Sequence, residues 1–210
     1  KENLTDHEFD LSSIRSGASV PRYFIEHLPS DILDIENVRL RKRVFLSVTL
    51  PLVLKVNEKI RSNRQQLAEL IEKQAADISF SPSEQAWLDK MAERYDSSPN
   101  DLESLRLQVD AIPVSLALAQ SIEESGWGTS RFARNGNALF GQRVWSAGHG
   151  LVPHERDTDA SYEVKAFQRL EQSIRSYALN LNRHPAYEEF RKLRAALRGE
   201  DEALDGLKLA

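Results

Sequence analysis

The chain has 210 residues, of which 40% are hydrophobic and 29% charged, and its formal net charge is −4. This is an ordinary globular composition, compatible with one or two domains and a sizeable core. A chain so close to neutrality shows no electrostatic footprint for nucleic acid. It contains no cysteine, which excludes disulfides and thiolate metal sites.

The N-terminal part is expected to be a loose segment followed by helix. Residues 1–20 are polar and rich in serine, which predicts a flexible arm. A helical period of apolar residues follows, and "LPSDIL" offers Ser30 or Asp31 as its N-cap. Pro51 should kink this helix or split it in two. The most apolar window, residues 44–54, is too short to span a bilayer and indicates a buried helix.

The middle and C-terminal parts predict more helices and one small β element. Ser81 stands three residues before Glu84, as in a capping box, and Pro82 falls at the first helical position. A short helix ends near Pro113, and the apolar helix "PVSLALAQSIEE" follows. Alternation in "YEVKAF" after the turn-prone "RDTDAS" predicts a β-hairpin, and the chain then returns to helix, with an interruption at Pro185. The predicted fold is mainly α (α+β).

Two adjacent glutamates, Glu123 and Glu124, end the most apolar helix. Gly126 is well placed as the left-handed residue after the C-cap, so both glutamates belong to the last turn. The helix macrodipole disfavours negative charge there and favours a protonated carboxyl, which is the form that a general acid needs. Periodicity places Glu124 near the buried face but separates the two only weakly, and two solvated surface charges are the plainer alternative.

The run "LAQSIEESGWGTSRFARNGNALFG" resembles the core of glycoside hydrolase family 73, the glucosaminidase-type peptidoglycan hydrolases. Their pattern is roughly A-Q-x-x-x-E-S-G-W-G, then a phenylalanine–alanine pair and N-x-L-F-G, and residues 119–141 match it in order. The resemblance implies a lysozyme-like fold with a small β-hairpin lobe. It makes Glu124 the catalytic acid and gives no role to Glu123. The helical segment from "LPSDIL" to "SNRQQL" resembles the N-terminal part of the Bax-like proteins, a branch of this family from the Gram-negative envelope.

Glycoside hydrolysis passes through an oxocarbenium-like transition state, which usually needs a second carboxylate. The resemblance places it in the β-hairpin, where Glu163 in "YEVKAF" and Glu155 in "VPHERD" both qualify. The Bax-like pattern favours Glu163, Glu155 stays open, and each could instead be an exposed strand charge. Tyr177 matches a family tyrosine that faces the cleft. It could bond the acetamido group of a sugar, or be a half-buried core residue with its hydroxyl satisfied.

Five further residues form the candidate substrate-binding set. Asn137 could equally cap a loop or contact sugar. Trp127 and Trp145 could stack on sugar rings, although packing under the helix end is favoured for Trp127. Gln120 and Phe140 belong to the matched run, and Phe140 is expected in the core.

The sequence gives little support for a metal or nucleotide site. No H-E-x-x-H motif, phosphate-binding glycine loop or G-x-S-x-G elbow occurs. His149 and His154, with Glu155 or Asp157, could be drawn as a zinc site, but a convincing third ligand is lacking. We therefore expect no metal and no other cofactor.

The predicted function is an endo-β-N-acetylglucosaminidase of bacterial peptidoglycan, with Glu124 as general acid. The alternatives are a muramidase or lytic transglycosylase on the same fold, and a non-catalytic peptidoglycan-binding or assembly protein. The predicted organisation is a flexible arm over residues 1–20, an N-terminal helical region over 21–98 packed on the catalytic domain, and a lysozyme-like glucosaminidase domain over 99–210.

The expected partner is the glycan strand of peptidoglycan, with no nucleic acid. The N-terminal helices could recruit an envelope protein, and the chain is expected to be a monomer. The expected location is the periplasm or cell envelope of a Gram-negative bacterium, with an N-terminal signal or anchor that this sequence lacks.

Overall fold

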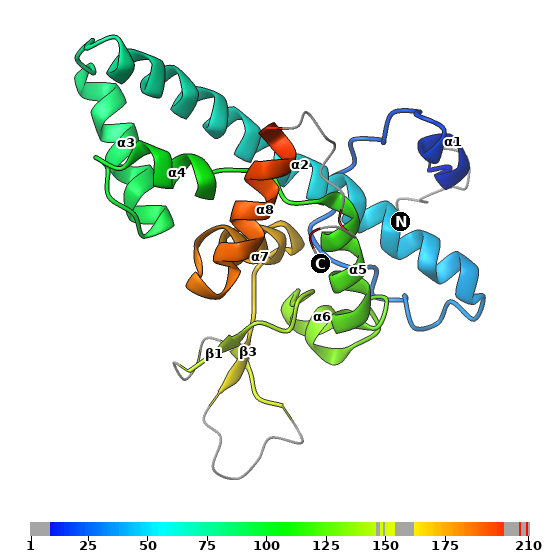
Figure 1. Cartoon of the computed structure of the whole chain (residues 1–210). Coiled ribbons are helices and arrows are strands. Elements are labelled where there is room, and N and C mark those ends of the chain that lie inside the picture. Colours follow the sequence, from blue (N-terminus) through cyan, green and yellow to red (C-terminus); the bar gives the residue numbers. More distant parts are fainter. Residues whose placement is uncertain are drawn as a thin grey trace. The chain divides into compact units, whose positions relative to one another are not determined.

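The protein is mainly helical, with one small sheet, which confirms the predicted mainly α, lysozyme-like fold class. A computed structural model describes residues 9–145, 148, 150–153, 162–199, 206 and 209. The helices are α1 (Leu11–Arg15), α2 (Val38–Ala75), α3 (Pro82–Tyr95), α4 (Leu102–Gln108), α5 (Val114–Ser125), α6 (Arg131–Gly136), α7 (Leu170–Arg183), the 3₁₀ turn η1 (Pro185–Tyr187) and α8 (Glu188–Gly199) (Figure 1).

The chain divides into two compact units. The first comprises residues 1–55 and 117–177, and the second comprises residues 56–116 and 178–210. The boundaries fall inside α2, α5 and α7. Each unit therefore combines residues from both sides of the predicted boundary near residue 99. The compact units are not the predicted domains, and the limits of the catalytic domain stay a prediction.

Helix α2 begins later than the sequence suggested and is not split. Residues 30–34 form turns, and the Asn37 side chain accepts hydrogen bonds from the backbone N–H groups of Arg39 (3.0 Å) and Leu40 (3.1 Å). The prediction of Ser30 or Asp31 as the N-cap is therefore wrong. Pro51 lies inside the continuous helix. The packing of the apolar residues around it outweighs the missing hydrogen bond at the proline.

The predicted start of α3 is confirmed in detail. The Glu84 N–H donates to the Ser81 hydroxyl oxygen (3.3 Å), and the Ser81 N–H donates to the Glu84 carboxylate (2.8 Å). Pro82 opens the helix. Lys73 donates to the same carboxylate, and this bond, with those from Ser81, lowers the pKa of Glu84 to about 2.

Within the first unit, three short antiparallel strands form one sheet. They are β1 (Arg143–Val144), β2 (Gly150–Leu151) and β3 (Glu163–Lys165), in the order β1-β3-β2. The strand predicted in "YEVKAF" is β3, which pairs antiparallel with the preceding strand β2, so the predicted β-hairpin is confirmed, and β1 adds a third strand on its other side. The predicted turn "RDTDAS" lies outside the described residues. A Cβ at Gly150 would overlap the backbone carbonyl of Val164, so this position needs glycine.

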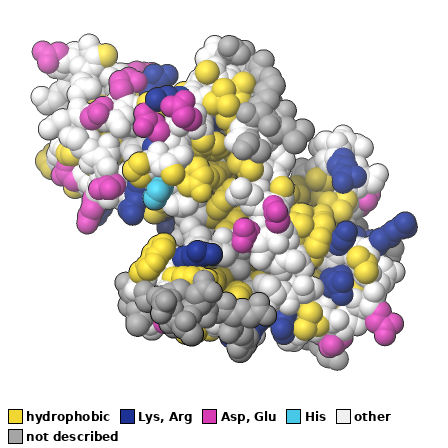
Figure 2. Space-filling model, turned by 60° about the horizontal axis from the view of Figure 1, so that its bottom comes forward, with side chains coloured by type: hydrophobic (Ala, Val, Ile, Leu, Met, Phe, Trp, Pro, Cys, Tyr) yellow, Lys and Arg dark blue, Asp and Glu magenta, His cyan; other side chains and the backbone are white. Residues whose placement is uncertain are grey.

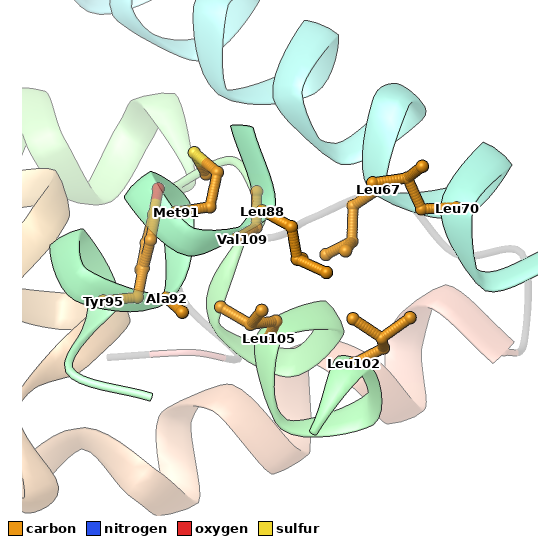
Figure 3. Close-up of a cluster of buried hydrophobic side chains, with 9 residues drawn as sticks. All are labelled: Leu67, Leu70, Leu88, Met91, Ala92, Tyr95, Leu102, Leu105 and Val109. Carbon is orange, nitrogen blue, oxygen red and sulfur yellow. The ribbon is translucent and has the colours of Figure 1, made fainter. Parts of the chain in front are cut away.

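Each unit has its own buried apolar residues. The core of the second unit joins the end of α2 to α3 and α4, and Figure 3 shows how side chains from these helices point toward one another. Its members are Leu67, Leu70, Leu88, Met91, Ala92, Tyr95, Leu102, Leu105 and Val109. In the first unit the buried apolar residues include Leu28, Ile32, Phe45, Val48, Ala117, Ala133, Leu139, Leu170 and Ile174.

A buried charge cluster in the second unit ties α4, α8 and the segment before α5 together. Asp110, only 2% exposed, accepts hydrogen bonds from Arg198 at 2.8 and 3.1 Å. Arg194, 1% exposed, donates to the carbonyl of Leu107 (2.8 Å) and to the side-chain oxygen of Asn182 (2.7 Å). Arg64 approaches the Asp110 carboxylate to 3.7 Å. Arginine side chains thus satisfy the carbonyl groups left unpaired at the end of α4.

The described surface carries charge of both signs. On the face in Figure 2, acidic and basic side chains both occur and neither sign covers the face alone, as expected from the small net charge. Among the described residues, no helix has the length and apolar character needed to cross a membrane.

Candidate active site

The end of α5 is fixed by a tight left-handed turn. Gly126 has φ +58°, as predicted, and Trp127 follows with φ +59°. The Trp127 N–H donates to the carbonyl of Ile122 (3.1 Å), which is the long bond of a Schellman motif. Glu123 and Glu124 therefore occupy the last turn of the helix.

Ser125 and Gly128 hold this turn in place. The buried Ser125 hydroxyl donates to the carbonyl of Ser121 (2.5 Å) and accepts the N–H of Gly128 (2.9 Å). A Cβ at Gly128 would lie 2.9 Å from side-chain atoms of both Leu28 and Phe45. The "ESGWG" run is thus explained by the backbone: serine closes the helix, and the glycines allow the left-handed turn and its close approach to the core.

Glu124 presents an exposed carboxyl group against Gly141. Both Glu123 and Glu124 are exposed, so the prediction that Glu124 lies near the buried face is wrong. What distinguishes Glu124 is its neighbour: a Cβ at Gly141 would lie 2.5 Å from Glu124 Oε2. Gly141 also has φ +55°. Position 141 therefore combines a left-handed backbone with the space that the carboxyl group occupies.

The segment that carries Gly141 is anchored by hydrogen bonds. Asn137 ends α6 in a left-handed conformation (φ +50°), and its amide donates to the carbonyl of Phe167 (2.9 Å). Its side-chain oxygen lies 3.2 Å from His27 Nδ1. The N–H of Leu139 donates to the Ser173 hydroxyl (3.1 Å). Asn137 is 6% exposed and has partners at both ends of its amide, which supports the loop-capping interpretation over sugar contact.

Tyr177 and Phe140 form a buried stacked pair beside Gln120. Their ring centroids are 4.0 Å apart with an interplanar angle of 4°, and they are 5% and 8% exposed. The Tyr177 hydroxyl donates to the side-chain oxygen of Gln120 (2.5 Å), and Gln120 itself is exposed. Phe140 is thus a core residue, as expected, while the substrate-binding part of the exposed Gln120 stays a prediction.

Glu163 is not an exposed strand charge. It is 8% exposed on β3, and its carboxylate accepts the N–H of Gly148 (3.1 Å) and of Gly150 (2.8 Å). These bonds fix a carboxylate at the sheet. They give Glu163 a structural part in the β lobe, and its catalytic part stays a prediction.

The two candidate stacking tryptophans differ. Trp127 packs edge-on against Phe45, with ring centroids 6.0 Å apart, and Lys42 Nζ lies 4.6 Å from the centre of its ring. This supports the packing role. Trp145 follows β1 and is 71% exposed, so its ring is accessible to a sugar.

Several candidates lie outside the described residues. These are Glu155, the rival second carboxylate, and the weak zinc candidates His149, His154 and Asp157. Within the described ranges, no group of three or more histidine, aspartate or glutamate side chains is arranged to hold a metal ion.

Gly141→Ala is expected to lower the rate of glycan cleavage by roughly 10- to 100-fold, because the new methyl group displaces the Glu124 carboxyl from its position. The left-handed backbone adds a folding cost of about 1–2 kcal/mol. Gly17→Ala is the matched control, since Gly17 has φ +100° and nothing lies within 4 Å of its Cβ position. Release of new reducing ends and thermal unfolding would be measured for both. Equal activity of the two variants would contradict a positioning role for Gly141.

The sequence identified Ser125 and Gly128 only as part of the helix end, and it gave no role to Gly141 or Ser173. Ser125, Gly128 and Gly141 stood inside the matched run, but only the backbone geometry shows what each one does. Ser173 carries no local signal, because its partner Leu139 lies 34 residues away.

Comparisons with known proteins identify the family of the chain. A family model for glucosaminidases, described as mannosyl-glycoprotein endo-beta-N-acetylglucosaminidase, matches residues 101–208. Protein bax of Escherichia coli (strain K12) is 37% identical over 171 residues, which is 77% of this chain and 58% of that protein. The chain thus spans less than two thirds of this relative's length. No solved structure matches the chain. The chain belongs to the glucosaminidase family, glycoside hydrolase family 73, in its Bax-like branch.

Proposed function

We propose that this protein is a peptidoglycan hydrolase that cleaves the glycan strand as an endo-β-N-acetylglucosaminidase, with Glu124 as general acid. The observation that carries the proposal is the Glu124 carboxyl group. It is exposed at the end of α5, stands where the family pattern has its acid, and lies against Gly141. Membership of the glucosaminidase family supports a glycan as the substrate.

In this proposal Glu124 protonates the glycosidic oxygen as the bond breaks. Gly141, which has no side chain, leaves the space in which the Glu124 carboxyl group stands at the end of α5. The Ser125–Gly128 turn keeps the helix end rigid, so that the acid has one position relative to the bound sugar.

The positive charge that develops at the anomeric carbon needs a second group. Glu163, with its carboxylate fixed by the N–H groups of Gly148 and Gly150, supplies a negative charge on the β lobe. Glu155 is the alternative carboxylate. The acetamido oxygen of the substrate could also serve, which would lessen the need for either glutamate.

Location and partners follow from the substrate. A peptidoglycan hydrolase acts where the wall is, so we place the protein in the periplasm or cell envelope of a Gram-negative bacterium. It acts as a monomer on glycan strands, and its N-terminal helices are the surface that an envelope protein partner would use.

The substrate class is tested by offering two glycans. Purified peptidoglycan and a mannosylated glycoprotein are each incubated with the protein, and new reducing ends are counted. The proposal predicts release from peptidoglycan alone. Release from the glycoprotein alone would move the substrate to the one named in the family description. Binding to peptidoglycan without release from either would favour a non-catalytic wall-binding protein.

A further inference from the structure

Gln120, Tyr177 and Phe140 form a small group within the first unit, beside the proposed acid. Gln120 lies on α5, four residues before Glu124, so their side chains are neighbours on the same helix face. Tyr177 comes from α7, and its ring is covered by Phe140, parallel to it at 4.0 Å. The stacked ring can move little, which fixes the position of the Tyr177 hydroxyl.

The carbonyl oxygen of the Gln120 amide faces the Tyr177 hydroxyl. The oxygen–oxygen distance is 2.5 Å. This length is found for O–H···O bonds, whereas N–H···O bonds have heavy-atom distances of about 2.7–3.2 Å. The Tyr177 hydroxyl is therefore the donor and the Gln120 carbonyl oxygen the acceptor. An amide oriented in this way turns its nitrogen, with two N–H donors, away from Tyr177.

The free end of the amide points to a particular kind of ligand. Among the described residues, no acceptor is bonded to Gln120 Nε2, and the side chain is exposed. Since the Gln120 Nε2 group can only donate hydrogen bonds, the ligand group that suits it best is one that can only accept them. On an N-acetylated sugar the acetamido carbonyl oxygen is the strongest acceptor of this kind, since the ring and glycosidic oxygens are weakly accepting ethers. A de-N-acetylated sugar presents an ammonium group there, which offers no acceptor and also donates.

We infer that Gln120 donates a hydrogen bond to the acetamido carbonyl oxygen of the bound sugar, and that Tyr177 acts through Gln120 as a positioning residue. This rests on the proposed function, since it concerns the same glycan site. It differs from the expectation that Tyr177 itself bonds the acetamido group. Tyr177 is 5% exposed and its hydroxyl proton is donated to Gln120, so that proton is not available to the sugar.

The test measures binding, so it does not depend on turnover. In a Glu124→Gln background, isothermal calorimetry gives the dissociation constants of tetra-N-acetylchitotetraose and of its fully de-N-acetylated counterpart. The variants are Gln120→Met, Tyr177→Phe and the two combined. Tyr177→Phe keeps the stacked ring, and Tyr187→Phe in η1 is the matched control. Thermal unfolding of each variant checks that the fold is intact.

Gln120→Met is expected to weaken binding of the N-acetylated probe by about three- to tenfold, the value of one neutral hydrogen bond, and to leave the other probe unchanged. Tyr177→Phe alone should weaken binding of the N-acetylated probe by about threefold. In the protein that already carries Gln120→Met, Tyr177→Phe should weaken this binding by no more than the Tyr187→Phe control does.

Three results would overturn the inference. The first is that Tyr177→Phe weakens binding of the N-acetylated probe equally whether residue 120 is glutamine or methionine, since Tyr177 would then contact the sugar itself. The second is an unchanged preference for the N-acetylated probe in Gln120→Met. The third is the absence of any such preference in the parent protein. Failure of the proposed function would instead appear as intact peptidoglycan after incubation with the wild-type protein.

Discussion

Asp110→Asn is expected to lower the free energy of unfolding by about 3–5 kcal/mol, because it leaves the buried Arg194 without its compensating charge. The variant keeps the size of the side chain but removes the negative charge that Arg194, Arg198 and Arg64 share. Arg194 is 1% exposed, and burial already lowers its pKa to about 10, although the charge of Asp110 opposes this shift. A loss of this size is a large part of the total stability of a typical domain.

The same cluster gives stability a defined pH dependence. Burial by itself raises the pKa of Asp110, but the hydrogen bond from Arg198 and the charges of Arg194 and Arg64 outweigh this and hold it below the ordinary value. The folded state therefore binds this proton less readily than the unfolded chain does. The contribution of Asp110 is fully present above the ordinary aspartate pKa of about 3.9, and it is lost as the pH falls through the lower folded value.

Urea unfolding at neutral pH measures the effect of Asp110→Asn. Glu103→Gln is the matched control, since Glu103 loses the same charge but pairs with Arg106 on the surface at 3.5 Å, and should cost less than about 0.5 kcal/mol. Equal unfolding midpoints for the two variants would show that the cluster does not hold the second unit together.

Glu124→Gln is expected to reduce the rate of glycan cleavage by roughly 10²- to 10⁴-fold, because an amide cannot protonate the leaving oxygen. Binding of glycan should persist, since the shape of the side chain is nearly unchanged. The neighbouring Glu123→Gln is the control: both residues are exposed in the last turn of α5, but only Glu124 lies against Gly141. The activity of both variants is measured as the decrease in turbidity of a peptidoglycan suspension. A similar decrease for each would remove the distinction between the two glutamates.

Local features of the fold could be predicted because their causes are local. The capping box of Ser81 and Glu84 and the left-handed Gly126 both follow from neighbours in the chain. The start of α2 could not be placed, because Ser30, Asp31 and Asn37 are all capable N-caps and tertiary packing selects Asn37. Left-handed Trp127 was also unexpected, since a bulky residue rarely adopts that conformation and only the surrounding turn imposes it.

Contacts between residues far apart in the chain could not be predicted from the sequence. The partners of Asp110 lie up to 88 residues away, and no pattern in the chain links them. The same holds for the stacking of Phe140 on Tyr177 and for the Glu124 carboxyl against Gly141. Periodicity misplaced Glu124 because the buried face of α5 runs through Ala117, Ser121 and Ser125 to the end of the helix, and Glu124 lies beside this face rather than on it. The family pattern predicts Glu124 as the acid, and the geometry gives the reasons for Ser125, Gly128 and Gly141 around it.

The central claim is tested most directly by identifying the ends of the cleaved glycan. Purified peptidoglycan is digested with the wild-type protein and with Glu124→Gln, the products are reduced with borohydride, and mass spectrometry identifies the terminal sugars. We predict new reducing ends on N-acetylglucosamine with the wild-type protein and almost none with Glu124→Gln. Ends on N-acetylmuramic acid or its 1,6-anhydro form, or the same yield from both proteins, would contradict an endo-β-N-acetylglucosaminidase that uses Glu124 as its acid.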